Sequence, residues 1–131
     1  RNIRNWLYVE DNVDAIKKIF FRGKIGNFYN IGGLEELSNI KIVKSICKRL
    51  DLIIPRKNNK KYESLITYVK DRPGHDLRYS LNSKKISQET GWKPKIKLNK
   101  GLDLTIKWYL ENKNWWKSIR KNKYKGERLG I

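Results

Sequence analysis

A short charged turn at residues 71–76 carries the side chains best suited to chemistry. Pro73 restricts its own φ to about −65° and Gly74 permits positive φ, which together favour a type II turn. Such a turn presents Arg72 and His75, the only histidine of the chain, side by side. A guanidinium offers a planar fork of donors to phosphate oxygens, and an imidazole adds a hydrogen bond or a charge. The residues alone leave two interpretations open, an anion site for phosphate or a solvated turn whose arginine pairs with a neighbouring aspartate.

The elements that would position this turn begin with a strand, a helix and a second strand. Residues 5–9 are aromatic and β-branched, which is typical of a strand. Asp11 occupies an N-cap position before a helix with apolar helical spacing that ends at Gly23. Residues 26–33 read as another strand running into a glycine turn. Strand, helix and strand within so short a stretch predict a parallel βαβ unit.

The remaining chain predicts more helices and one strand that leads into the turn. A second amphipathic helix starts near Asn39, with Ser38 or Asn39 as its cap, and carries a buried Cys47. The apolar run 65–69 predicts the strand. Further helices are expected over 83–90, closed by a glycine, and from residue 102 toward 119, continuous or kinked.

Composition sets broad limits on the function. The 131 residues suffice for one domain, and 31 Lys+Arg against 13 Asp+Glu give a net charge of +18. This charge would attract polyanions, but it is scattered among Asn and Ile residues and does not form one stripe. The lone cysteine excludes an internal disulfide and fits a reducing compartment. Because no apolar run approaches a membrane span and no signal-like start is present, we expect a soluble cytoplasmic protein; a start at Arg1 fits a fragment.

Several catalytic motifs are missing from the sequence. No glycine-rich turn joins a strand to a following helix, so no dinucleotide loop is expected. One histidine and one cysteine exclude a metal cluster of these ligands. The Tyr-x-x-x-Lys spacing at 109–113 lies on an apolar helical face, and we interpret it as structural. Aromatic side chains could stack nucleobases, although we expect Trp6, Trp92 and Trp108 in the core.

Five motifs together resemble the C-terminal part of the bacterial dTDP-glucose 4,6-dehydratase family, within the extended short-chain dehydrogenase/reductase superfamily. They follow the family order and cover nearly the whole chain: Arg-Asn-Trp-Leu-Tyr-Val-Glu-Asp at 4–11, Tyr-Asn-Ile-Gly-Gly at 29–33, Asp-Arg-Pro-Gly-His-Asp at 71–76, Gly-Trp-Lys-Pro at 91–94 and Gly-Glu-Arg-Leu-Gly at 126–130. The sequence departs from the family at Asn5, where Asp is usual, and in the loop 34–38.

The resemblance implies an α/β fold in which residues 1–33 form the last βαβ of a Rossmann sheet and residues 34–131 form a small α+β substrate domain. The family converts dTDP-glucose to dTDP-4-keto-6-deoxyglucose, a precursor of rhamnose and other deoxysugars. Bound NAD takes a hydride from C4, water is lost across C5 and C6, and the hydride returns to C6. The resemblance places NAD, the catalytic groups and most of the homodimer contacts in a missing N-terminal portion. We therefore expect no catalytic residue here.

The resemblance also implies a nucleotide-binding role for this part of the chain. Arg4 and Arg72 would bind the diphosphate of dTDP-glucose with help from His75, Asn39 would contact the nucleotide, and Tyr124 would approach it from the tail; Asp71, Pro73 and Gly74 complete the turn. Helix capping explains Asn39 equally well. Three alternatives stay open: another NAD-dependent nucleotide-sugar epimerase or dehydratase, a basic nucleic-acid-binding module, and a remnant without a stable fold.

Overall fold

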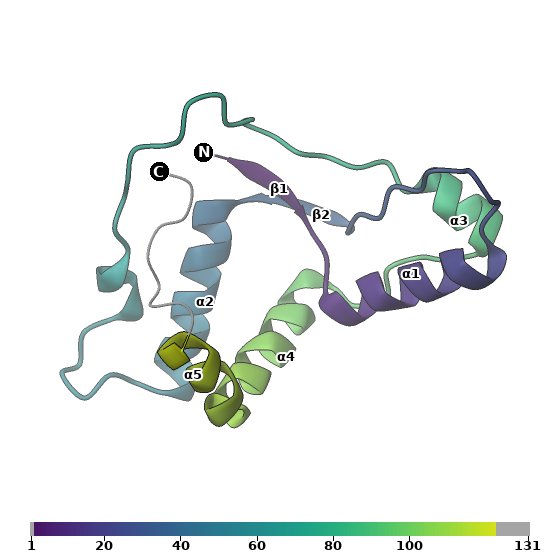
Figure 1. Cartoon of the computed structure of the whole chain (residues 1–131). Coiled ribbons are helices and arrows are strands. Elements are labelled where there is room, and N and C mark those ends of the chain that lie inside the picture. The colour runs from purple at the N-terminus through teal and green to yellow at the C-terminus, as the bar shows by residue number, and fades with distance from the viewer. Residues whose placement is uncertain (1, 123–131) are drawn as a thin grey trace.

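The structure, a computed structural model, describes residues 2–122 and has a mixed α/β architecture (Figure 1). Its elements in chain order are β1 (Ile3–Trp6), α1 (Val9–Arg22), β2 (Glu35–Ser38), α2 (Asn39–Ile53), the 3₁₀ helix η1 (Tyr62–Leu65), α3 (Lys84–Thr90), α4 (Leu98–Glu111) and α5 (Lys113–Asn122). The sheet lies in the middle of Figure 1, with α1 and α3 at one end and α2, α4 and α5 at the other.

The sheet differs from the predicted parallel βαβ unit. β1 pairs with β2 in antiparallel register, with Ile3 opposite Ser38 and Trp6 opposite Glu35. On its other side Ile3 forms an isolated parallel bridge with Arg78. Residues 26–33 are assigned to no strand, because a strand requires a hydrogen-bonded neighbour and β1 has its partners elsewhere. The prediction of a strand over 26–33, and of a loop over 34–38, was therefore wrong for the described chain.

Helix α1 starts two residues before the predicted cap. Asp11 lies inside its first turn and is buried, with its side-chain Oδ2 accepting the backbone N–H groups of Lys95 and Ile96 at 3.0 and 2.8 Å. The backbone carbonyl of Asp11 accepts the indole N–H of Trp92 at 3.1 Å. Asp11 thus joins α1 to the segment after α3 instead of capping its own helix.

A small core fills the space between α1 and α3. Ala15, Ile86 and Trp92 are fully buried there, and Leu7, Ile19, Tyr29 and Ile31 pack around them. α3 ends at Gly91 in the left-handed conformation, φ +70°, as the sequence predicted. The buried state of Trp92 was also predicted, whereas Trp108 on α4 is 41% exposed and does not belong to the core.

A second apolar contact joins the helices at the other end. Ile42 and Cys47 of α2 and Ile106 of α4 are buried, and an ion pair between Arg49 and Asp103 links the two helices at 2.6 Å. The buried position of Cys47 confirms the prediction, and burial raises the pKa of its thiol. The long C-terminal helix breaks at Asn112, so that α4 and α5 are separate.

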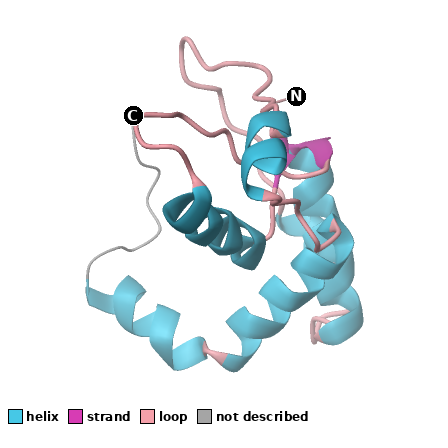
Figure 2. Ribbon diagram, turned by 90° about the vertical axis from the view of Figure 1, so that its right-hand side faces the viewer, coloured by secondary structure: helices cyan, strands magenta, loops and turns pink. Residues whose placement is uncertain are grey.

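The segment between α2 and α3 is mostly loop, as the pink trace in Figure 2 shows. The predicted strand over 65–69 is absent. Leu65 ends η1, and Tyr68 and Val69 are 78% and 68% exposed. An isolated apolar run cannot form a strand without a neighbour to complete its hydrogen bonds. The turn at 71–76 is therefore held by side chains and by the contacts of residues 77–79 with β1.

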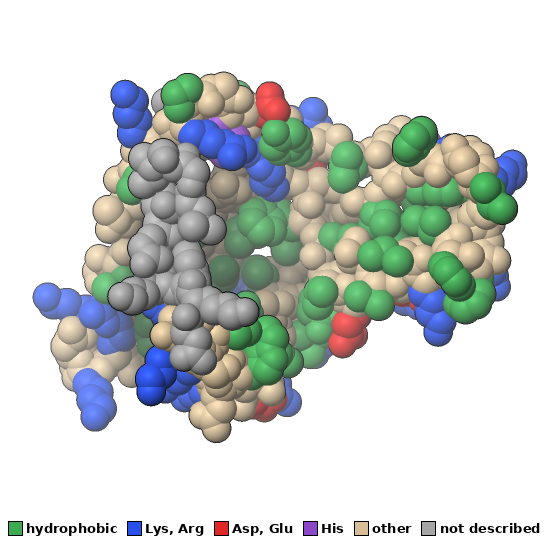
Figure 3. Space-filling model, in the orientation of Figure 1, with side chains coloured by type: hydrophobic (Ala, Val, Ile, Leu, Met, Phe, Trp, Pro, Cys, Tyr) green, Lys and Arg blue, Asp and Glu red, His purple; other side chains and the backbone are tan. Residues whose placement is uncertain are grey.

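One face of α1 is apolar and exposed. Val9, Val13, Ile16 and Phe20 follow helical spacing and remain 55–81% exposed, and Phe28 nearby is 90% exposed. Figure 3 shows hydrophobic side chains gathered at this end of the molecule. An exposed apolar helix face of this kind is typical of an interface. Within residues 2–122, no helix is long and apolar enough to cross a membrane.

Candidate functional site

The charged turn has the predicted backbone. Pro73 and Gly74 form a turn, and Gly74 has φ +69°, close to the value that a type II turn requires at its third position. Open space surrounds Gly74, so this backbone conformation rather than crowding explains the glycine. Arg72 and His75 consequently leave the turn on either side of a rigid dipeptide.

His75 lies at the centre of a polar cluster between the turn and β1. Its side chain is 18% exposed. Its Nδ1 lies 2.8 Å from Oδ1 of Asp71, and its Nε2 lies 2.6 Å from Nη2 of Arg4. Asn2, just before β1, donates its amide to Oδ2 of Asp71 at 2.8 Å and lies 3.0 Å from Nδ1 of His75. Side chains distant in sequence therefore meet at one place.

Asp71 organises the start of the turn. Its Oδ1 accepts the backbone N–H of Arg72 at 2.9 Å, besides its contact with His75. The hydrogen bond from Asn2, followed by that from His75, holds the pKa of Asp71 well below its usual range. The carboxylate is therefore ionised at neutral pH and acts only as an acceptor.

Arg4 projects from β1 into the same cluster. Its Nη1 donates to the carbonyl of Ile3 at 2.7 Å and its Nη2 to the carbonyl of Asp76 at 3.2 Å. The guanidinium carbon lies 4.4 Å from the centre of the Tyr79 ring. Among the described residues, Nε of Arg4 has no acceptor, so the fixed guanidinium keeps hydrogen-bonding capacity for a further group.

Arg72 differs from Arg4 because its guanidinium is exposed. Within residues 2–122 it forms no ion pair with Asp71, Asp76 or another carboxylate, so the predicted alternative of a locally paired arginine is not what the structure shows. A hydrogen bond with Asp76 raises the pKa of Tyr79, while the charges of Arg4 and Arg72 oppose that rise. Arg4 and Arg72 therefore both lie close enough to Tyr79 to affect the pKa of its hydroxyl.

Asn39 adjoins the cluster through the backbone. It is the first residue of α2, and its N–H donates to the carbonyl of Asn2 at 2.9 Å. Ser38 occupies the N-cap position without a side-chain bond, so capping does not account for Asn39, whose side chain is exposed. Tyr124, the remaining predicted site residue, lies outside the described residues.

Two members of the cluster were not predicted from the sequence. Asn2 and Tyr79 contact the predicted residues, but neither belongs to a motif that indicates binding. The alternation of extended backbone could have identified Asn2, because residues two apart, such as 2 and 4, point to the same side. No comparable signal indicates Tyr79, whose place depends on the bridge between Ile3 and Arg78.

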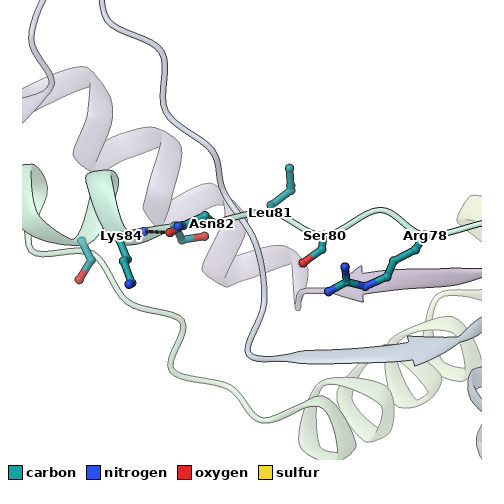
Figure 4. Close-up of a pocket in the computed structure, with 7 residues that line it drawn as sticks. Arg78, Ser80, Leu81, Asn82 and Lys84 are labelled. Atoms are coloured by element: carbon teal, nitrogen blue, oxygen red, sulfur yellow. Dashed lines mark hydrogen bonds between the residues drawn. The ribbon is translucent and has the colours of Figure 1, made fainter. Parts of the chain in front are cut away.

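A separate hollow follows the turn along the chain, lined by residues from Arg78 to Ser87 (Figure 4). Arg78 donates to both carboxylate oxygens of Glu36 at 2.8 and 3.0 Å, and Ser80 donates to the same carboxylate. These bonds lower the pKa of Glu36, with Arg78 as the larger cause. Because its arginine is already neutralised, this hollow is a weaker anion site than the turn. The segment 34–38, in which the sequence departs from the family, therefore contacts Arg78 and Ser80 through Glu36.

The glycines at 32 and 33 do not form a cradle for a dinucleotide. A Cβ on Gly33 would lie 1.7 Å from the carbonyl oxygen of Trp6, and one on Gly32 would lie 2.2 Å from Oδ1 of Asn5. These glycines allow close packing on β1 and do not precede a helix that could receive a pyrophosphate. The described residues therefore provide no glycine-rich loop for the pyrophosphate of NAD, and they include no group of three or more His, Cys, Asp and Glu that could hold a metal.

Known proteins share this sequence and fold. The sequence model of a family described as GDP-mannose 4,6 dehydratase matches residues 1–105. A dTDP-glucose 4,6-dehydratase of Escherichia coli is 48% identical over 131 residues, covering 98% of this chain and 36% of the relative. The chain therefore spans about a third of the length of that curated relative.

Solved structures of dTDP-glucose 4,6-dehydratases also match this chain. The dTDP-glucose 4,6-dehydratase of Bacillus anthracis, in complex with NAD, superposes with a TM-score of 0.72 at 38% identity, covering 90% of this chain and 34% of that one. The dTDP-glucose 4,6-dehydratase of Streptomyces venezuelae, with NAD and TYD bound, gives a TM-score of 0.74 at 36% identity with the same coverage. The likeness extends to the arrangement of the elements and is not confined to short motifs.

Proposed function

Because the chain belongs to the GDP-mannose 4,6 dehydratase family, we propose that it is the C-terminal, nucleotide-binding part of a dTDP-glucose 4,6-dehydratase. In this proposal residues 1–33 adjoin the Rossmann domain and residues 34–131 form the substrate domain. The observation that carries the proposal is that the charges of Arg4 and Arg72 both act on Tyr79, while Arg72 is exposed and pairs with no carboxylate among residues 2–122.

The cluster suits a diphosphate in charge and geometry. Among the described residues, no carboxylate pairs with the guanidinium of Arg72 and no acceptor bonds Nε of Arg4. A charge-assisted hydrogen bond contributes about 1.5–3 kcal/mol. Asn39 adds an exposed amide that the backbone of Asn2 holds beside the cluster. We assign to Tyr124 a contact from the tail.

The chemistry of the reaction belongs to other parts of the enzyme. The described residues provide no glycine-rich loop for NAD, and they carry no acid–base pair that we assign to the elimination of water. We propose that this chain positions dTDP-glucose while NAD and the catalytic groups come from the part that the longer relatives possess. The exposed face of α1 would contact that part, and the homodimer and the cytoplasmic location expected from the sequence belong to the same proposal.

The test is titration calorimetry of the chain with dTDP, UDP and a single-stranded DNA oligonucleotide at low and raised salt. We expect saturable binding of dTDP that is tighter than that of UDP. Preference for UDP would instead support a different nucleotide-sugar enzyme of the superfamily. Binding of DNA that falls log-linearly with salt, together with no response to dTDP, would support the nucleic-acid alternative and contradict the proposal.

A further inference from the structure

We infer that His75 is a positioning residue: it is held as the neutral Nδ1–H tautomer by Asp71 and uses its Nε2 to fix the guanidinium of Arg4 for the diphosphate. This inference rests on the proposed function for the role of Arg4. It gives His75 a task that differs from direct contact with the ligand.

Two independent contacts assign the proton on the ring. Asp71 is an ionised acceptor, so the 2.8 Å contact with Nδ1 of His75 requires an N–H on that nitrogen. Arg4 can only donate, so the 2.6 Å contact between its Nη2 and Nε2 of His75 requires a lone pair on Nε2. Both contacts are satisfied by one tautomer, and neither a charged ring nor the Nε2–H tautomer satisfies both. In that tautomer the amide nitrogen of Asn2, 3.0 Å from Nδ1, is a second donor to the Asp71 carboxylate and not a hydrogen-bond partner of the ring.

Asn2 holds Asp71 at the start of a chain of contacts that runs through His75 to Arg4, which we call the relay. Its amide donates to Oδ2 of Asp71 at 2.8 Å, which leaves Oδ1 for the histidine and for the N–H of Arg72. The charged groups that contact His75 among the described residues are Asp71 of its own turn and Arg4 of β1. Arg72 and Asp76 adjoin it along the chain.

The relay has a defined effect on Arg4. The carbonyls of Ile3 and Asp76 and the Nε2 of His75 contact the two Nη atoms, which leaves Nε as the donor without an acceptor among the described residues. Protonation of His75 removes the acceptor and places an imidazolium N–H against a guanidinium. A protonated ring would therefore hold Arg4 less firmly, and we expect the diphosphate to bind more weakly to that form.

The ligand-free chain provides the first test. Labelling with ¹⁵N-histidine gives the signals of one ring, because the sequence has a single histidine. We expect ¹⁵N shifts of the neutral Nδ1–H tautomer at pH 7.5. Asp71→Asn should release that tautomer, whereas Asp76→Asn, which removes the same charge from the same turn, should preserve it. An Nε2–H or charged ring in the unchanged chain would overturn the inference, whether or not any nucleotide binds.

Binding gives the second test, with dTDP-glucose as the probe because its phosphates have no group that titrates near neutral pH. His75→Gln places an amide oxygen near Nε2 and should retain affinity to within about threefold, whereas His75→Asn should lose roughly tenfold or more. Affinity should be lower at acid pH, where a protonated ring could not accept from Arg4. Affinity that rises as pH falls, with Gln as weak as Asn, would mean that His75 binds the diphosphate as a cation. Absence of binding by the unchanged chain would contradict the proposed function. The ¹⁵N shifts of His75 in the ligand-free chain would still show whether the ring is held as the Nδ1–H tautomer.

Discussion

Arg72→Ala is expected to reduce dTDP affinity by roughly tenfold to a hundredfold, because a lost charge-assisted contact costs about 1.5–3 kcal/mol. The side chain is exposed and forms no ion pair within the described residues, so its removal leaves no buried group without a partner. The fold should therefore remain intact, with an unchanged circular-dichroism spectrum. Titration calorimetry measures the loss of affinity directly.

A matched control separates this effect from the loss of one charge in a strongly basic chain. Arg22 lies at the end of α1, far from the turn in Figure 1, and its side chain donates to the carbonyl of Thr90. Arg22→Ala removes the same charge and should change dTDP affinity less than twofold, as roughly expected for screened, distant charges. Equal losses in the two variants would show that dTDP responds to net charge and not to a site.

Trp92→Ala is expected to destabilise the chain by about 3–5 kcal/mol, because a fully buried aromatic side chain leaves a cavity when it is removed. The variant also leaves the carbonyl of Asp11 without the indole N–H that it accepts. Since single domains are stable by only about 5–15 kcal/mol, this loss removes a large share of the folding free energy. Urea unfolding followed by circular dichroism measures the change.

Trp108→Ala provides the comparison for the core. Trp108 is 41% exposed on α4 and makes edge contacts with Tyr109 and Trp115. We expect this variant to lose about 1–2 kcal/mol, because aromatic pairs and partial burial contribute less than a filled core. If both variants unfolded at the same urea concentration, Trp92 would contribute no more to stability than Trp108, which would contradict the central role that we assign to Trp92.

Local backbone chemistry explains which parts of the fold could be predicted. Pro73 with Gly74, and Gly91 after α3, impose their turns through φ alone, and both were predicted correctly. Asp11 could equally cap a helix or accept bonds from a distant segment, and the contacts with residues 95 and 96 decide between them. The sequence around position 11 does not contain that information.

Strands were predicted less well because they depend on neighbours that the local pattern does not identify. The runs 26–33 and 65–69 have strand composition, but β2 and the bridge at Arg78 take the positions beside β1. The candidate site likewise includes residues that the local sequence indicates and residues that only the packing reveals. The turn residues alone indicated Arg72 and His75 and the resemblance added Arg4, whereas the roles of Asn2 and Tyr79 follow only from the packing of β1 on the turn.

The most direct test of the central claim is a ¹H–¹⁵N correlation spectrum of the chain during titration with dTDP. The account predicts that the largest shift changes fall on Arg4, Asn39, Arg72, Gly74 and His75, with α5 nearly unaffected. Because this measurement resolves individual residues, it distinguishes a site on the turn from general attraction to a basic surface. Changes that spread over the lysines of α5, or that leave the turn unperturbed at saturation, would contradict the assignment of the turn as the diphosphate site.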